Sequence, residues 1–179
     1  MAEPAAAPPL DPYQVLLESY AVNERMNQLL LEHLDPRVWR AKAPGSRGRT
    51  IAAIFAHMHN IRCKWLRLSA REPSSRLDRT RCTQEQVKAA LAESARRCAE
   101  LLASALIARR VRTFLRDGWA KPWPAGPAMV VYMIAHDTHH RGQVCMLARQ
   151  LGSPLPAKVD GGIWNWEKLW RECGFTGPH

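Results

Sequence analysis

Apolar residues recur at helical spacing in four long stretches of this chain, and breaks containing proline or glycine separate these stretches. A repeat of about 3.6 residues places the apolar side chains on one face of a helix, which then has to pack against other helices. No stretch of any length alternates apolar and polar residues as a half-buried strand would. The sequence therefore predicts an all-α protein.

Capping signals indicate where these helices begin and end. Asp11 followed by Pro12 is typical of a helix start, and Thr83 with Gln86 forms a capping box. Gly152 followed by proline is typical of a helix end. We expect helices over residues 12–34, 50–70, 83–110 and 127–151, a short tryptophan-rich helix over 163–173, and loops over 36–49 and 155–162.

Length and composition indicate one globular domain. With 179 residues and a hydrophobic fraction of 46%, the chain is large enough to bury a core. Residues 1–10 contain prolines and lack the basic start and apolar centre of a signal peptide, so we expect a disordered arm before a single domain over 11–179. No apolar run is long enough to span a membrane, and the five scattered cysteines do not form a disulfide framework. We therefore expect a cytoplasmic protein.

The chain is strongly basic, with a formal net charge of +10, and Lys and Arg crowd residues 62–81. Such a patch could attract a phosphate backbone or an acidic substrate. It lacks the interleaved aromatic residues of single-strand binding surfaces. We interpret the patch as a solvated face and loop, and we do not expect a nucleic-acid partner.

Two histidines of the fourth expected helix, His136 and His140, are spaced four residues apart. This spacing places both rings on one face of a helix, about one turn apart. The same side carries the apolar residues Met129, Met133, Val144 and Leu147. Because polar rings on an apolar face need a partner, and neutral imidazole is a good ligand for zinc and its neighbours, the pair predicts a divalent metal ion.

A third ligand is expected from the second helix, which carries His57 and His59 at opposite edges of its apolar arc. Helix geometry alone does not choose between them. Three protein ligands with one open position are typical of a catalytic metal site, whereas four ligands close a structural one. Zinc and nickel are both compatible with such a donor set.

These residues carry a resemblance to a known family. His57 followed by Trp65 and Leu66, and much later His136, His140 and the Arg-Gly-Gln run that ends at Gln143, resemble the DinB/YfiT family of metal-dependent proteins. The resemblance covers about residues 11–172. It implies a four-helix bundle, here with an extra short C-terminal helix, in which His57, His136 and His140 hold one metal ion.

The residues around these ligands also carry expectations. His59 is an alternative ligand, His139 is expected beside the ligands or at the surface, and Gln143 could bond a ligand or a substrate. Asp137 either orients a ligand histidine or is exposed. The sequence offers no convincing general base, and the contributors that the first helix could supply are Glu18, Asn23 and Glu24.

Two further residues of the same run have structural expectations. Arg141 points away from the ligand face and is expected to pair with a carboxylate that orients the helix. Gly142 is expected to permit a close helix–helix approach, since it has no side chain.

The function expected is that of a metal-dependent enzyme acting on a small molecule, either a hydrolase or a thiol-dependent S-transferase. Some relatives are similar to transferases and isomerases that use a low-molecular-weight thiol. The alternative is a non-catalytic metal-binding protein with a stress-response or binding role. Relatives are commonly dimeric, and tryptophans 164, 166 and 170 offer an adhesive surface, so we expect a homodimer.

Overall fold

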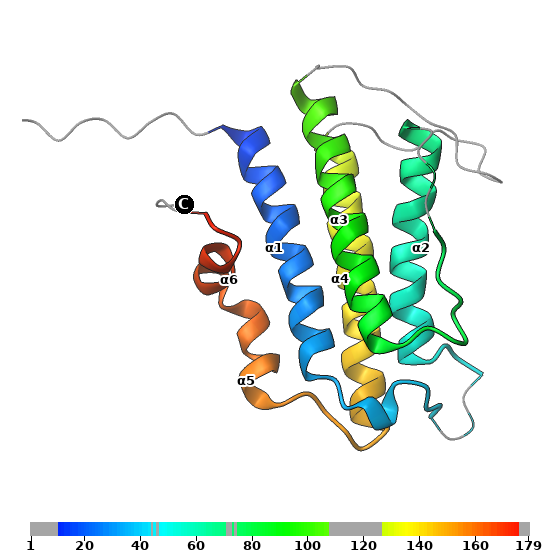
Figure 1. Ribbon diagram of the computed structural model, residues 1–179. Helices are drawn as coiled ribbons and strands as arrows, with labels where there is room; N and C mark the ends of the chain where they lie inside the picture. Colours follow the sequence, from blue (N-terminus) through cyan, green and yellow to red (C-terminus); the bar gives the residue numbers. More distant parts are fainter. Residues whose placement is uncertain are drawn as a thin grey trace, which may run out of the picture.

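The structure is a computed structural model that describes residues 11–43, 45, 47–70, 73, 75–107 and 127–175. Four long helices pack side by side (Figure 1): α1 (Pro12–His33), α2 (Ile51–Ala70), α3 (Gln84–Ile107) and α4 (Pro127–Gln150). The described ranges contain no strand. The all-α, four-helix architecture predicted from the sequence is therefore confirmed.

The bundle places α1 opposite α2 and α3 opposite α4. α1 and α2 each contact both α3 and α4. α1 and α4 run in one direction, and α2 and α3 run in the other (Figure 1). The N-terminal half of α2 thus lies beside the C-terminal half of α4, which brings their histidines to the same level.

The expected capping signals form. The Asp11 carboxylate accepts a hydrogen bond from the backbone N–H of Tyr13 at 2.9 Å. Thr83 and Gln86 bond each other's backbone N–H groups at 2.9 and 3.1 Å, as a capping box does. Gly152 has a φ of 76°, the left-handed conformation that ends α4. The expected N-terminal arm and residues 108–110 of the third helix lie outside the described residues.

The C-terminal region is more structured than the sequence predicts. A short helix, α5 (Ala157–Asp160), occupies the stretch expected to be a loop. The expected tryptophan-rich helix is divided into η2 (Gly162–Trp164) and α6 (Trp166–Glu172). The division lies at Asn165, whose side chain caps α6 by accepting from the backbone N–H of Lys168 at 3.1 Å. Likewise, η1 (Pro36–Val38) forms within the loop expected after α1.

These C-terminal elements cover the outer face of α1 (Figure 1). Leu169 and Trp170 of α6 are buried against Val22 and Met26 of α1. This packing buries apolar side chains on the side of α1 that faces away from the other three long helices. Within the described residues, no helix combines the length and apolarity that a membrane crossing requires.

The bundle interior has two apolar clusters separated along its axis by polar side chains. One cluster lies around the α1–α2 connection and includes Leu30, Ile51, Phe55, Leu91 and Val144. The other lies toward the opposite end and includes Tyr20, Trp65, Leu66, Leu102 and Met133. The polar groups between them position the candidate site described next.

Candidate metal centre

Three histidines from two helices meet at one place in the bundle. His57 comes from α2, and His136 and His140 come from α4. Each offers one ring nitrogen such that the three atoms lie within 4.8 Å of one another. The ring centroids of His57 and His140 are 4.8 Å apart, and those of His136 and His140 are 4.6 Å apart. We call these residues the three-His cluster.

His59 lies on another side of α2 and is not part of this cluster. Its Nδ1 is 2.9 Å from the carbonyl oxygen of Ala90, and its Nε2 is 2.8 Å from that of Ser75. One ring nitrogen therefore faces a backbone carbonyl of α3, and the other faces a backbone carbonyl of the segment before α3. Of the two α2 histidines left open by helix geometry, the structure places His57 beside the α4 pair.

Two imidazoles of the cluster, those of His57 and His140, are held neutral by their surroundings. Burial lowers the pKa of His57 to about 3, and the positive charge of Arg49 lowers it further. Burial also lowers the pKa of His140 to about 4, although the hydrogen bond to Gln143 opposes this shift. A neutral imidazole keeps a free lone pair, which is the form that binds a metal ion.

Gln143 fixes the orientation of His140. The Oε1 atom of Gln143 lies 2.8 Å from His140 Nδ1. Because a carbonyl oxygen only accepts, His140 Nδ1 carries the proton and Nε2 keeps the lone pair. The amide nitrogen of Gln143 lies 3.0 Å from Nε2 of the exposed His139. His139 and Gln143 thus neighbour the cluster.

Asp137 connects the cluster to the bundle interior. Its Oδ2 accepts hydrogen bonds from Asn23 at 2.9 Å, Asn27 at 3.1 Å and Arg62 at 2.6 Å. Its Oδ1 lies 3.5 Å from Nδ1 of His136, which is long for a hydrogen bond, and the carboxylate faces that ring. Asp137 is 1% exposed. Of its two expected placements, the structure shows the buried one.

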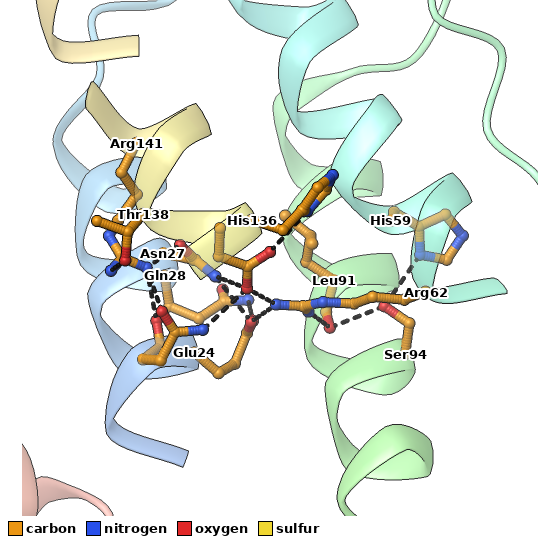
Figure 2. Close-up of polar contacts among 12 residues, drawn as sticks. Glu24, Asn27, Gln28, His59, Arg62, Leu91, Ser94, His136, Thr138 and Arg141 are labelled. Carbon is orange, nitrogen blue, oxygen red and sulfur yellow. Dashed lines mark hydrogen bonds and ion pairs between the residues drawn. The ribbon is translucent and has the colours of Figure 1, made fainter. Parts of the chain in front are cut away.

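Arg62 extends from α2 between the helices to reach this carboxylate (Figure 2). It is 1% exposed, and it pairs with Asp137 and with Glu24 of α1 at 2.7 Å. We call Glu24, Arg62 and Asp137 the ion-pair cluster. Burial alone would raise the pKa of Asp137, but the Arg62 charge and the hydrogen bonds hold it well below its usual range.

The sequence interpretation of Arg62 as part of a solvated basic patch is wrong. Arg76, Arg79 and Arg81 of that patch are exposed, whereas Arg62 is among the most buried residues described. A signal for this exists in the sequence, because Arg62 lies four residues from both Met58 and Leu66, which are fully buried. Helical periodicity places it in the apolar stripe rather than outside it.

The expectations for five other residues require correction. Arg141 donates to the side-chain oxygens of Asn23 and Asn27 at 2.6 and 2.9 Å rather than to a carboxylate. Gly142 does not permit a close helix contact, since a Cβ atom there would meet nothing within 4 Å. The three α1 residues proposed as contributors to a general base have other partners: Asn23 binds Asp137, Glu24 pairs with Arg62, and Glu18 accepts from Gln14.

Two aromatic residues enclose the His136 side of the cluster. The Trp65 ring lies edge-on to His136, with centroids 5.7 Å apart. The Tyr132 ring stacks near it at 6.4 Å. These rings keep water from that side of the imidazole and hold its plane, which a ligand position requires.

A comparison with known protein families decides what kind of bundle this is. The model of the DinB family matches residues 6–168, which is most of the 179-residue chain. The chain belongs to the DinB family. No curated protein matches it.

The three-His cluster of this DinB protein fits a divalent metal ion. Among the described residues, His57 Nδ1 is buried without a hydrogen-bond partner. A buried polar nitrogen left in this way is costly, and an ion bound there would offset the cost. Three imidazoles on two helices are a donor set that suits zinc and neighbouring transition metals.

Proposed function

We propose that this DinB protein is a metal-dependent enzyme in which His57, His136 and His140 hold one zinc or nickel ion. The observation that carries the proposal is the convergence of three ring nitrogens within 4.8 Å at the junction of α2 and α4. Three protein ligands leave a coordination position for a small-molecule substrate. A structural site would need a fourth ligand to close it.

A divalent ion at this position supplies Lewis acidity, which polarises a carbonyl group or favours the deprotonated form of a thiol. The protein residues provide the orientation. Gln143 holds His140 with Nε2 unprotonated, and Asp137 faces Nδ1 of His136. Because all three ligands are uncharged when neutral, the ion would keep its full positive charge.

We propose thiol-dependent S-transfer as the reaction, with hydrolysis as the second candidate. Asp137 is the carboxylate facing the cluster, and its low pKa makes it a weak base for deprotonating water. A thiol needs less help, since its ordinary pKa of about 8.5 is far below that of water. A low-molecular-weight thiol is therefore the co-substrate that this arrangement favours.

The test compares the metal-loaded and metal-stripped protein in two assays. One assay follows conjugation of a small thiol to a chromogenic aryl halide, and the other follows hydrolysis of a nitrophenyl ester. We expect metal-dependent turnover in the first assay and its loss in the His136→Ala variant. Stoichiometric metal binding without metal-dependent turnover in either assay would support the alternative, a non-catalytic metal-binding protein with a stress-response or binding role.

We also propose that the protein forms a homodimer. Trp164 and Trp166 are two residues apart in the chain and are 79% and 41% exposed. Large exposed aromatic side chains of this kind are common in protein interfaces. Light scattering at micromolar concentration should give twice the chain mass, and a monomer mass would overturn this proposal.

A further inference from the structure

An open pocket of about 560 Å³ lies beside the three-His cluster, between the start of α2 and the second half of α4. Its lining includes Arg49, Ile54, Gln143, Met146, Leu147 and Gln150. Gln143 belongs to both places, because it also bonds His140 of the cluster at 2.8 Å. A molecule in this pocket would therefore contact the side chain that orients His140.

The lining has one charged side chain, one apolar wall and two amides. The charge belongs to Arg49, which is exposed at the end of the loop before α2. Arg49 shares this pocket with Gln143, the side chain that bonds His140 of the cluster. The wall is formed by Ile54, Met146 and Leu147.

We propose that this pocket binds the carboxylate-bearing part of the substrate while the reacting group lies at the three-His cluster. A guanidinium donates two parallel hydrogen bonds to a carboxylate, and the amides of Gln143 and Gln150 can add donors. Ile54, Met146 and Leu147 would cover the apolar chain that joins the two ends. This inference rests on the proposed metal-dependent function, and it assigns the substrate class to acidic small molecules.

Gly142 gives the pocket its space. A Cβ atom at this exposed position would meet nothing within 4 Å, and Gly142 is part of the pocket lining. A large side chain at position 142 would therefore extend into the pocket. Alanine at the same position adds only a methyl group and favours the helix.

The experiment uses the full chain loaded with cobalt(II), because thiolate binding to cobalt gives a visible absorption band. ω-Mercaptocarboxylates of increasing chain length are titrated, each beside the ω-mercapto alcohol of equal length. We expect the best carboxylate to bind about tenfold more tightly than its alcohol, as one charge-assisted pair predicts. Arg49→Gln should bring the two within about twofold of each other, and Arg149→Gln, an exposed arginine of α4 outside this pocket, should not.

A second variant tests the pocket separately from the charge. Gly142→Leu should weaken binding of the carboxylate series about tenfold while cobalt binding stays stoichiometric, and Gly142→Ala, whose side chain is smaller, should weaken it less. If cobalt does not bind, the proposed function fails, and this inference fails with it. If cobalt and thiols bind but carboxylates have no advantage, or Arg49→Gln keeps the advantage, the pocket assignment alone is wrong. Tighter binding of an ω-mercaptoalkyl phosphate than of any carboxylate would overturn the carboxylate assignment.

Discussion

Two polar clusters of α2 and α4 lie next to each other and are built in opposite ways. In the ion-pair cluster, Arg62 has two carboxylate partners, Glu24 and Asp137, at 2.7 and 2.6 Å. In the three-His cluster, His57 and His136 each keep a buried ring nitrogen without a hydrogen-bond partner among the described residues. His136 and Asp137 are adjacent in the chain, yet they belong to different clusters.

The difference indicates which polar groups hold the fold together and which are available for chemistry. Opposite charges that pair within the protein connect the helices that carry them. The imidazoles of His57 and His140 have free lone pairs for a ligand, because burial lowers their pKa and keeps them neutral. Asp137 joins the two, since Oδ2 accepts from Arg62 while Oδ1 faces His136.

The largest effect is expected when the ion-pair cluster is broken. Arg62→Leu would leave Asp137 and Glu24 buried without their cation, and removal of one partner from a buried ion pair costs about 3–5 kcal/mol. Arg96→Leu is the matched control, because Arg96 also pairs with two carboxylates, Glu93 and Glu100, but is 58% exposed. Its loss should cost much less, because solvent screens an exposed ion pair. Urea unfolding monitored by circular dichroism measures both, and equal losses would contradict the distinction between the clusters.

Metal removal should have the next largest effect. An ion that binds only the folded state stabilises it by about 2.7 kcal/mol when the free ion is a hundredfold above its dissociation constant. Chelation should therefore lower the melting temperature. The helical circular dichroism at room temperature should remain, because the two apolar clusters pack without the ion. Loss of all helix on chelation would mean that the ion is scaffolding rather than part of a functional site.

Asp137→Asn tests the connection between the clusters. The amide keeps the shape of the carboxylate but lacks the negative charge that pairs with Arg62 and strengthens the attraction for the N–H of His136. Replacement of a carboxylate that orients a ligand histidine lowers metal affinity by about 10–100-fold. Calorimetric titration with zinc measures this loss, and Thr138→Ala, which removes an Arg141 partner at 2.8 Å, is the control. Unchanged affinity in Asp137→Asn would show that Asp137 serves the ion pair alone.

The pH dependence of the free energy of unfolding, measured without metal, should report on the three-His cluster. His57 and His140 have pKa values of about 3 and 4 in the fold, below the ordinary value of about 6.5. As the pH falls through this window, the unfolded chain takes up protons that the folded protein does not, so the free energy of unfolding decreases. A His57→Asn, His140→Asn double variant should lose stability less steeply over the same range. Parallel curves for the two proteins would contradict the assigned neutral rings.

Much of the fold is predictable because its signals are local. Asp11, Thr83 and Gly152 mark helix ends through atoms within a few residues, and these caps form as expected. The spacing of His136 and His140 is also a local property of one helix. By contrast, the break at Asn165 was missed, since a continuous apolar pattern crosses it.

The partners of the polar side chains are less predictable because they are distant along the chain. Arg62 and Asp137 are separated by 75 residues, and nothing at either position specifies the other. The choice between His57 and His59 has the same origin, because both flank the apolar arc of α2. It depends on which side α3 and α4 occupy, and only the packing of the bundle determines that.

The most direct test of the three-His site is the number of metal ions that the protein binds when four of its histidines are replaced one at a time. The purified protein and its His57→Ala, His59→Gln, His136→Ala and His139→Ala variants are equilibrated with zinc, desalted and analysed for metal. We predict one ion per chain in the unchanged protein and in the His59→Gln and His139→Ala variants, and no stoichiometric ion in His57→Ala or His136→Ala. Full occupancy at unchanged affinity in His136→Ala would contradict the three-His site, and metal loss in His59→Gln with retention in His57→Ala would contradict its α2 ligand.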